Sequence, residues 1–311
     1  MYIGIDLGGT NIAAGIVDES GKIICKESLP TLRERGNDAI VADMARICEI
    51  LVEKSGLLMS DIKAVGIGCP GTVDNERGVV VYSNNIVMED YPLVAKFREY
   101  IDLPVNIEND ANAAAFGEYI STASDKKSFV LITLGTGVGG GIILDGKLWR
   151  GFNGAGAELG HTSIVMNGAP CTCGRRGCFE AYASVTALIS QTKSAMAENP
   201  DSLMNKIAAE NGKVNGRTSF DCARMGDSAA IAVRDKYIEY IAEGVVNIIN
   251  TLQPEVFVIG GGISREGDTI LTPLKQIVYK NDFNKYMPKT EIRMAKLFGD
   301  AGIVGAALAA K

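Results

Sequence analysis

The stretch from His161 to Cys178 combines side chains that could bind a metal ion. It holds the only histidine of the chain, His161, together with Cys171, Cys173 and Cys178. Structural zinc takes four nitrogen or sulfur ligands in a tetrahedron, and three thiolates with one imidazole are a suitable set. The Cys171-x-Cys173 spacing is shorter than the common C-x2-C spacing, so a loop of reduced thiols that binds nothing is the alternative. A four-ligand site is closed to substrate, and we therefore expect zinc to brace this loop.

Two carboxylates flank the predicted metal loop. Glu158 stands three residues before His161, and Glu180 stands two residues after Cys178. A loop held by a metal ion would keep both side chains rigid. Carboxylates with an imidazole edge suit a polyol sugar, because each buried hydroxyl needs a hydrogen-bonding partner.

A third set of polar side chains lies at a predicted strand-to-helix junction. Glu108, Asn109 and Asp110 precede the alanine-rich stretch ANAAAFGE. Asp110 could simply cap the helix, since Asp is favoured at that position, and composition alone favours this interpretation. If the loop faces a bound phosphate, the same carboxylate could accept a proton from an attacking hydroxyl group.

Two similar segments predict the architecture. Residues 2–17 and 129–144 each have an apolar run, a glycine turn and a second apolar run, which indicates a strand, a tight turn and a strand. Asp6 aligns with Thr133, and Gly8 aligns with Gly135. Such self-similarity predicts two related α/β domains that face one another across a cleft.

The glycine turns could bind phosphate. Residues 135–140 also fit the G-x-G-x-x-G dinucleotide pattern, but that pattern requires a helix next, and here a strand follows. Bare backbone N–H groups in a turn form a nest for an anion. Ordinary hairpin turns are the alternative for either turn alone, whereas a matched pair suggests a nucleotide triphosphate held by both.

A third glycine cluster follows a long helix. Apolar residues recur at helical spacing over residues 229–252, and a short buried strand then ends in Gly260, Gly261 and Gly262. A strand that ends in glycines lets adenine and ribose lie against the backbone, although close packing of the helix on the strand would explain the glycines equally well. The small residues of 300–311 predict a last helix that packs back on the N-terminal domain.

Composition excludes several classes of protein. The chain has 311 residues, 47% of them hydrophobic, and a net charge of −6 without a long basic run, which argues against nucleic acid as a main partner. No apolar stretch reaches the length of a membrane span, and the N-terminus does not resemble a signal peptide. Four further cysteines are scattered (Cys25, Cys48, Cys69 and Cys222), which indicates reduced thiols in a cytoplasmic protein.

Together these motifs resemble the ROK family of bacterial repressors, open reading frames and sugar kinases. DLGGTN, ENDANAAAFGE, LGTGVGGG, GAGAELGH and CTCGRRGCFEAYAS occur in order over nearly the whole chain. The resemblance implies an α/β fold of the two-domain, actin-like ATPase (ribonuclease H-like) type with an interdomain cleft. The smaller domain would comprise residues 1–117 and 300–311, and the larger one residues 118–299.

The resemblance also implies a role for individual residues. Asp110 would be the general base on the 6-hydroxyl of a sugar, and His161 would bind zinc through one ring nitrogen and a sugar hydroxyl through the other. The sugar would be bound by Gly71, Asn84, Asn109, Asp110, Glu158, His161 and Glu180. The nucleotide and its magnesium ion would be bound by Asp6, Gly8, Gly9, Thr10, Asn11, Thr136, Gly137, Gly261 and Gly262. Structural zinc would be bound by His161, Cys171, Cys173 and Cys178.

The function expected from this resemblance is ATP-dependent phosphorylation of a hexose, with glucose as the first choice and a homodimer as the expected assembly. N-acetylmannosamine, N-acetylglucosamine, fructose, allose or a β-glucoside could be accepted after changes around Gly71, Thr72, Asn84 and Glu158. A sugar-sensing repressor is the rival from another class. Such proteins carry a helix-turn-helix domain before the first strand, and a first strand at Tyr2 leaves no room for it.

Overall fold

The computed structural model describes residues 1–311, and the chain divides into two compact units. Unit 1 comprises Met1–Leu131, Gly140–Ala157 and Lys296–Lys311, and unit 2 comprises Ile132–Gly139 and Glu158–Ala295. These bounds differ from the predicted domains, which divide the chain after residue 117. A continuous helix, Asp110–Thr122, runs through that position and lies within unit 1.

Unit 1 is built on a five-stranded sheet with the strand order β3-β2-β1-β4-β8. The strands are β1 (Tyr2–Leu7), β2 (Asn11–Val17), β3 (Ile23–Pro30), β4 (Ala64–Cys69) and β8 (Val105–Asn109). The first three strands pair antiparallel, as the predicted hairpin requires, whereas β1, β4 and β8 run parallel. All six residues of β4 are buried, which is typical of a parallel strand covered on both faces.

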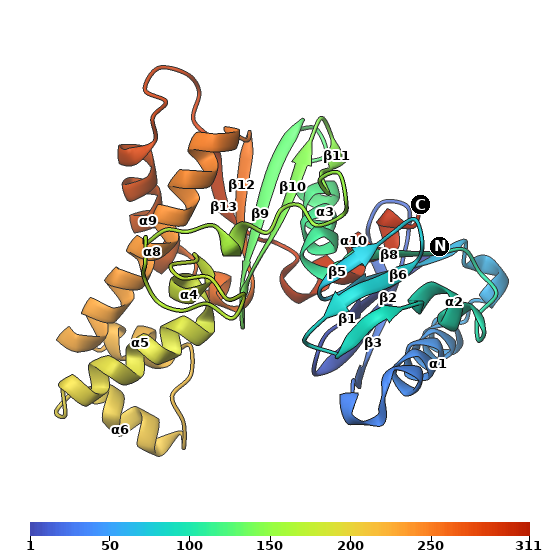
Figure 1. Cartoon of the computed structure of the whole chain (residues 1–311), viewed down its shortest axis with the longest axis horizontal. Coiled ribbons are helices and arrows are strands. Elements are labelled where there is room, and N and C mark those ends of the chain that lie inside the picture. Colours follow the sequence, from blue (N-terminus) through green and yellow to red (C-terminus); the bar gives the residue numbers. More distant parts are fainter. The chain divides into compact units, whose positions relative to one another are not determined.

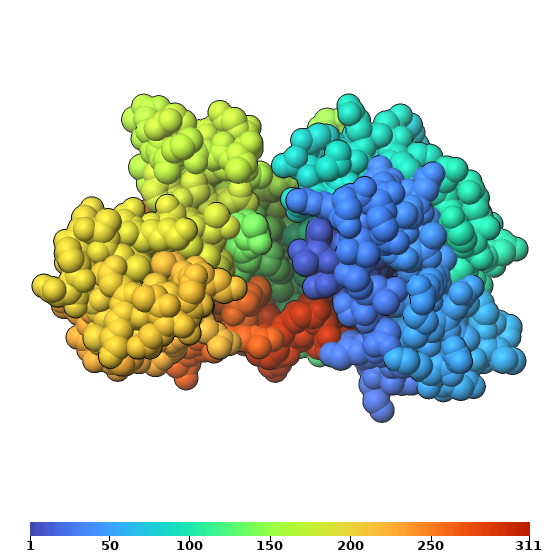
Figure 2. All heavy atoms as spheres, turned by 90° about the horizontal axis from the view of Figure 1, so that it is seen from below, coloured from blue at the N-terminus to red at the C-terminus, as the bar shows by residue number.

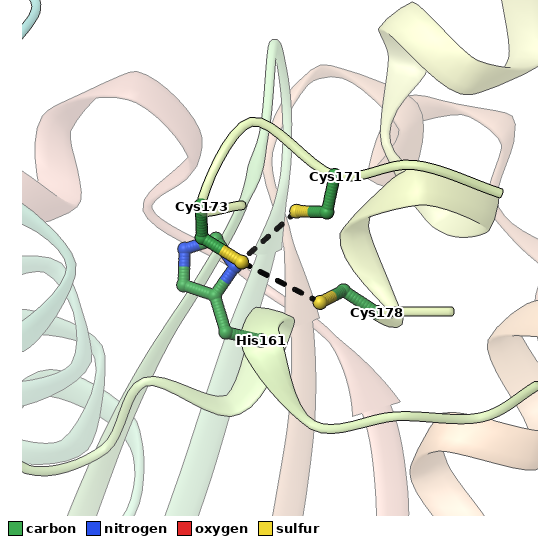
Figure 3. A group of neighbouring side chains, drawn as sticks. All are labelled: His161, Cys171, Cys173 and Cys178. Atoms are coloured by element: carbon green, nitrogen blue, oxygen red, sulfur yellow. Dashed lines mark hydrogen bonds between the residues drawn. The ribbon is translucent and has the colours of Figure 1, made fainter. Parts of the chain in front are cut away.

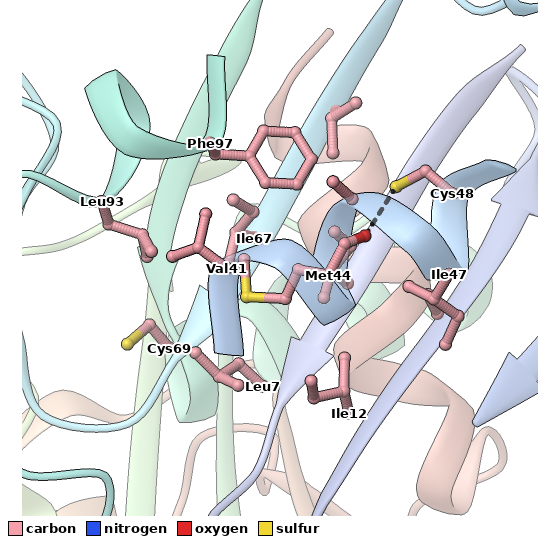
Figure 4. Packing of buried hydrophobic residues seen from close by; sticks show 14 of the residues in the cluster. Leu7, Ile12, Val41, Met44, Ile47, Cys48, Ile67, Cys69, Leu93 and Phe97 are labelled. Atoms are coloured by element: carbon pink, nitrogen blue, oxygen red, sulfur yellow. Dashed lines mark hydrogen bonds between the residues drawn. The ribbon is translucent and has the colours of Figure 1, made fainter. Parts of the chain in front are cut away.

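Helices cover both faces of this sheet (Figure 1). On one face lie α1 (Asn37–Ser55) and α2 (Leu93–Arg98), and on the other lie α3 (Asp110–Thr122) and α10 (Ala301–Ala309). Figure 4 shows the apolar side of α1, with Val41, Met44 and Ile47, packed against Leu7 and Ile12 of the sheet. This core fixes the strands whose ends carry the candidate site.

The C-terminal helix packs unusually close to the sheet, as its small residues predict. A Cβ atom added to Gly66 of β4 would lie 1.8 Å from the carbonyl oxygen of Ala306 in α10. The same atom on Gly4 of β1 would lie 1.9 Å from the carbonyl oxygen of Ile303. Helix and sheet backbones therefore touch, and only glycine fits at these two strand positions.

A smaller sheet in unit 1 is absent from the sequence-based prediction. It contains β5 (Thr72–Asp74), β6 (Val79–Ser83) and β7 (Met88–Tyr91), paired antiparallel in that order. Its strands have only three to five residues, which is too short for a clear alternating pattern.

A second five-stranded sheet has the order β11-β10-β9-β12-β13. Its strands are β9 (Ser128–Leu134), β10 (Val138–Leu144), β11 (Lys147–Leu148), β12 (Val256–Gly260) and β13 (Glu291–Met294). In both sheets, three consecutive strands form one side of the sheet and two later strands form the other. Strands β10 and β11 pair antiparallel, like β2 and β3, and strands β12 and β13 pair parallel, like β4 and β8. The predicted internal similarity is thus confirmed at the level of strand order.

The remaining helices belong to unit 2. They are α4 (Glu180–Ala183), α5 (Val185–Glu198), α6 (Leu203–Glu210), α7 (Thr218–Arg224), α8 (Ser228–Leu252) and α9 (Asp268–Asn281). Side chains of Ser184, Ser202 and Asp227 cap α5, α6 and α8 by accepting backbone N–H groups. Figure 2 shows α5 and α6 (yellow) at the surface of this unit. None of the helices has the length and apolar character needed to cross a bilayer.

Candidate active site and metal centre

Three parallel strands of unit 1 bring polar residues together at their carboxyl ends. Asp6 in β1 pairs with Gly68 in β4, and Gly68 pairs with Glu108 in β8. A Cβ atom on Gly68 would lie 3.7 Å from the Cα atom of Asp110. The carboxyl ends of parallel strands are the usual ligand-binding edge of such sheets, and two aspartates meet there.

Asn109, not Asp110, caps helix α3. The side-chain oxygen of Asn109 accepts the backbone N–H of Asn112 at 3.0 Å, and Asp110 is the first helical residue. Asp110 Oδ1 accepts the backbone N–H of Ala111 at 2.8 Å. The capping interpretation of Asp110 is therefore wrong, because Asn109 caps the helix and Asp110 is its first residue.

Burial perturbs both aspartates at this edge. It raises the pKa of Asp110, although hydrogen bonds from the backbone N–H groups of Ala111 and Asp110 oppose the change. Burial, together with the negative charge of Asp110, raises the pKa of Asp6 to about 7. The first turn of α10 lies against Asp6, since a Cβ atom on Gly302 would lie 2.7 Å from Asp6 Oδ2. Paired carboxylates with raised pKa values are typical of sites that bind cations or transfer protons.

The first glycine turn is held by a residue that the sequence analysis did not single out. The backbone N–H of Gly8 donates to the carbonyl of Asn11 at 2.9 Å and closes the turn. Thr31 is fully buried; its hydroxyl donates to Gly8 O at 2.6 Å and its N–H donates to Thr10 O at 2.9 Å. Gly9 is half-buried and Thr10 exposed, so the turn presents its backbone to a ligand.

Gly71 lies beside the cap of α3. Asn109 Nδ2 donates to Gly71 O at 2.9 Å. Gly71 has a φ of +104°, and a Cβ atom there would lie 2.1 Å from the carbonyl oxygen of Tyr82, so no other residue fits. Asn84 is exposed in the turn between β6 and β7, and its neighbour Asn85 lies closest to Gly9.

Unit 2 contains the second glycine turn, between β9 and β10. The N–H of Gly135 donates to the carbonyl of Gly137 at 3.0 Å. Gly261 lies directly against this turn, because a Cβ atom there would lie 2.3 Å from Leu134 O. The second and third glycine clusters, more than a hundred residues apart in the sequence, are therefore neighbours within one unit.

Glu180 connects the second turn with the predicted metal loop. Its Oε2 accepts the backbone N–H of Val138 at 3.0 Å, and Gly137 lies beside the same oxygen. Its Oε1 lies 3.4 Å from the hydroxyl of Thr172 and 3.8 Å from Cys171 Sγ. A single carboxylate thus joins two motifs that the sequence analysis treated separately.

The predicted zinc ligands converge in space. The three thiols and the imidazole of His161 point toward one another, and their ligand atoms all lie within 4.8 Å of one another (Figure 3). His161 Nδ1 lies 3.6 Å from Cys171 Sγ, and Cys173 Sγ lies 3.6 Å from Cys178 Sγ. Ligands about 2.0 to 2.3 Å from a tetrahedral zinc ion lie roughly 3.3 to 3.8 Å apart, so the set fits this metal.

The surroundings change the pKa values of two of the thiols in opposite directions. The backbone N–H of Arg175 lowers the pKa of Cys173. Burial raises the pKa of Cys178 to about 12 in the metal-free chain. A metal ion needs the thiolate form, and its positive charge is what would keep a buried Cys178 deprotonated.

Packing anchors the metal loop to the long helix of unit 2. The ring of Phe179 lies against Gly244 of α8, where a Cβ atom would be only 2.5 Å from the ring. The guanidinium of Arg175 donates to the carbonyl of His161 at 2.9 Å. Glu158 is exposed at the start of the short turn Leu159–His161, and the N–H of His161 donates to its carbonyl at 3.1 Å.

Comparison with known proteins agrees with this arrangement. The model of the ROK family matches residues 2–311. The chain belongs to the ROK family.

ROK proteins of known structure and function resemble it over nearly its whole length. A glucokinase of Thermotoga maritima is 38% identical, over 98% of this chain and 95% of its own. A glucokinase of Halalkalibacterium halodurans is 36% identical, over 98% of this chain and 93% of its own. The crystal structure of a ROK glucokinase from Streptomyces griseus, in complex with glucose and AMPPNP, has a TM-score of 0.85 at 36% identity and covers 98% of this chain and 97% of that one. The α/β fold is therefore of the actin-like ATPase type that ROK glucokinases share.

The residues that the ROK resemblance singles out fall into two groups. Unit 1 contains the aspartate pair and the first glycine turn: Asp6, Gly8, Gly9, Thr10, Asn11, Gly71, Asn84, Asn109 and Asp110. Unit 2 contains the second turn, Glu158, Glu180, Gly261, Gly262 and the metal cluster. Within each group the structure brings the motifs together, and Asn84 lies between Ser83, which borders Gly71, and Asn85, which borders Gly9.

Proposed function

We propose that this chain is an ATP-dependent hexokinase that phosphorylates the 6-hydroxyl group of glucose. One observation carries the proposal: Asp110 is not needed as a helix cap, and its carboxylate lies beside Asp6 at the ligand-binding edge of a parallel sheet. The names of the ROK relatives support the choice of glucose as acceptor and ATP as donor.

In unit 1, Asp110 acts as the general base. Its carboxylate accepts the proton of the 6-hydroxyl as that oxygen attacks the terminal phosphoryl group, and a raised pKa makes the carboxylate a stronger proton acceptor. Asn109 and Gly71 hold other hydroxyl groups of the sugar. Magnesium bound with ATP supplies positive charge to the phosphates, and Asp6 helps to position that ion.

In unit 2, backbone N–H groups at Thr136 and Gly137 bind phosphate, and Gly261 and Gly262 lie beside adenosine. Glu180 stabilises the second glycine turn, because its carboxylate accepts the N–H of Val138. This contact supports a role for Glu180 in binding the sugar close to the phosphates. His161 and Glu158 contribute sugar contacts.

We also propose that the Cys3His cluster holds structural zinc. His161, Cys171, Cys173 and Cys178 would be the ligands, and the metal would supply rigidity to the loop rather than Lewis-acid chemistry. The Nδ1 atom of His161 lies nearest the thiols, which leaves Nε2 as the nitrogen for a sugar hydroxyl.

The proposal extends to assembly and location. We place the protein in the cytoplasm. We also propose that it forms a homodimer, and sedimentation analysis can test that assembly. N-acetylmannosamine, N-acetylglucosamine, fructose, allose and β-glucosides are the alternative acceptors, and residues around Gly71, Thr72, Asn84 and Glu158 would decide among them.

A hexose panel with two protein variants tests the proposal. We expect release of ADP with glucose, and loss of about 10² to 10⁴ in kcat for Asp110→Asn, because the amide cannot accept the proton. Calorimetry should still detect glucose binding to that variant. Near-normal turnover by Asp110→Asn would refute the general-base assignment, and no turnover of any hexose by the unmodified protein would refute the kinase.

A further inference from the structure

Glu108 is a buried carboxylate that directly precedes the proposed acceptor residues. Its side chain is 1% exposed. Oε1 accepts the backbone N–H of Asn109 at 3.0 Å and the side-chain amide of Asn112 at 3.2 Å. Both donors belong to the segment that begins α3, so Glu108 fixes the start of the helix that carries Asp110.

Arg150 is the cationic partner of this carboxylate. Its Nε donates to Glu108 Oε2 at 2.6 Å. The side-chain amide of Asn75 lies 3.4 Å from the same oxygen and also donates to the carbonyl of Ile107. Removal of one member of a buried ion pair leaves an uncompensated charge, so the placement of Glu108 depends on Arg150.

Asn109 transmits this placement to Asp110. Glu108 holds its N–H, Gly71 O accepts from its Nδ2 at 2.9 Å, and its Oδ1 accepts the N–H of Asn112 at 3.0 Å. Release of the first contact would free the peptide that joins Asn109 to Asp110. A shift of about 1 Å at a reacting group can lower a rate about 10²-fold.

We infer that Arg150 is a positioning residue for phosphoryl transfer: through Glu108 it holds Asn109, and thereby Asp110, in the geometry that proton transfer needs. The inference rests on the proposed kinase function. Arg150 does not belong to the residues proposed to bind sugar, nucleotide or metal. It contacts the carboxylate of Glu108 rather than the reacting atoms.

The surroundings of Arg150 offer a direct test. Its side chain is 38% exposed and lines a pocket of about 480 Å³, together with Asp74, Asn75 and Phe152. Truncation to alanine would therefore leave a hole that solvent reaches beside Glu108. A free guanidinium ion could enter this hole and restore the charge and the hydrogen bond.

The experiment compares Arg150→Ala with the unmodified protein in the ADP-release assay with glucose and ATP. We expect kcat to fall about 10- to 100-fold, with the KM for ATP within about twofold of the original value. Millimolar guanidinium chloride, far below denaturing concentrations, should restore at least part of kcat, and Arg150→Lys should lie between the two. Urea, which has the shape but lacks the charge, should restore nothing.

Arg77→Ala is the matched control. Arg77 is another arginine of unit 1, its side chain is 61% exposed, and its carboxylate partners Asp74 and Asp90 are exposed or half-buried. Exposed ion pairs of this kind are worth little, so its kcat should stay near normal and should not respond to guanidinium. An unchanged kcat in Arg150→Ala, or equal restoration by urea, would overturn the inference.

A double-mutant cycle shows whether Arg150 acts through Glu108. In a Glu108→Gln background there is no buried charge to balance, so adding Arg150→Ala should lower kcat much less than it does alone. Fully additive losses would overturn the inference even if Arg150→Ala is unstable. If the unmodified protein and the Arg150→Ala variant are equally active, only the positioning role of Arg150 is refuted. If the unmodified protein is inactive, the proposed kinase activity itself is refuted.

Discussion

At the scale of single residues, the environment of Asp110 decides the proposed chemistry. A carboxylate in water loses its proton near pH 4, and burial moves that transition to higher pH. The same burial acts on Asp6, whose pKa is raised further by the charge of Asp110. A base at this position therefore titrates at a higher pH than an exposed aspartate.

This perturbation predicts an acidic limb in the pH profile. As the pH falls through the raised pKa of Asp110, the carboxylate takes up a proton and can no longer accept one from the sugar, so kcat/KM should fall. The limb should lie above the ordinary aspartate value of about 3.9. Initial rates across the acidic range, at saturating magnesium and ATP, measure it.

The exposed Asp125 provides the control for that profile. It pairs with Lys126 at the surface, and Asp125→Asn should leave the limb unchanged. A rate that stays constant down to the pKa of a free aspartate would show that no buried carboxylate controls the reaction.

At the scale of elements, the loop from His161 to Glu180 joins the Cys3His cluster to the second glycine turn. One end of the loop carries His161, and the other continues into Glu180, which accepts the N–H of Val138 in that turn. The loop contains little regular secondary structure, so we expect its shape to depend on the proposed zinc ion and on the packing of Phe179 against α8.

Loss of the metal should consequently loosen this element. We expect purified protein to contain about one zinc ion per chain, since four ligands make one site. Cys173→Ala should lower the melting temperature and raise the KM for glucose, because Glu158, His161 and Glu180 would lose their support. Metal analysis by mass spectrometry, thermal unfolding and steady-state kinetics test these expectations together.

Cys25→Ala is the matched variant for that experiment. Cys25 is half-buried in β3, apart from the cluster, and its loss should leave zinc content and the KM for glucose unchanged. Protein that is fully active and contains no zinc would refute the structural role of the metal.

At the scale of the whole molecule, two distant parts of the sequence form one core. Helix α10 comes from the C-terminus and lies on β1 and β4 near the N-terminus, with backbone contacts that only glycine permits. The candidate site depends on this contact, because the first turn of α10 lies against Asp6.

Gly66→Ala should therefore destabilise unit 1. The added methyl group would overlap the carbonyl of Ala306, and overpacking of this kind costs about 1 to 3 kcal/mol or more in the free energy of unfolding. Denaturant titration measures the change. Gly299→Ala, which meets nothing within 4 Å, should be close to neutral. Equal stability of the two variants would contradict the close packing of α10.

Features that depend on residues close together in the sequence could be predicted. Cysteines and a histidine at metal-ligand spacing predicted a cluster, which the structure confirms as a set of converging side chains. Apolar periodicity predicted the hairpins, the helix at 229–252 and the C-terminal helix, because burial follows the period of each element.

Contacts between distant residues were decided only by the tertiary structure. The sequence analysis considered Asp110 as the cap of α3, whereas Asn109 occupies that position in the structure. Three hydrogen bonds of the candidate site join distant positions. The bond between Thr31 and Gly8 spans 23 residues, and those between Glu180 and Val138 and between Arg150 and Glu108 span 42 residues each. A side chain such as Arg150 has the same local pattern whether it is solvated or paired with a buried carboxylate, so only packing of the whole chain determines which it is.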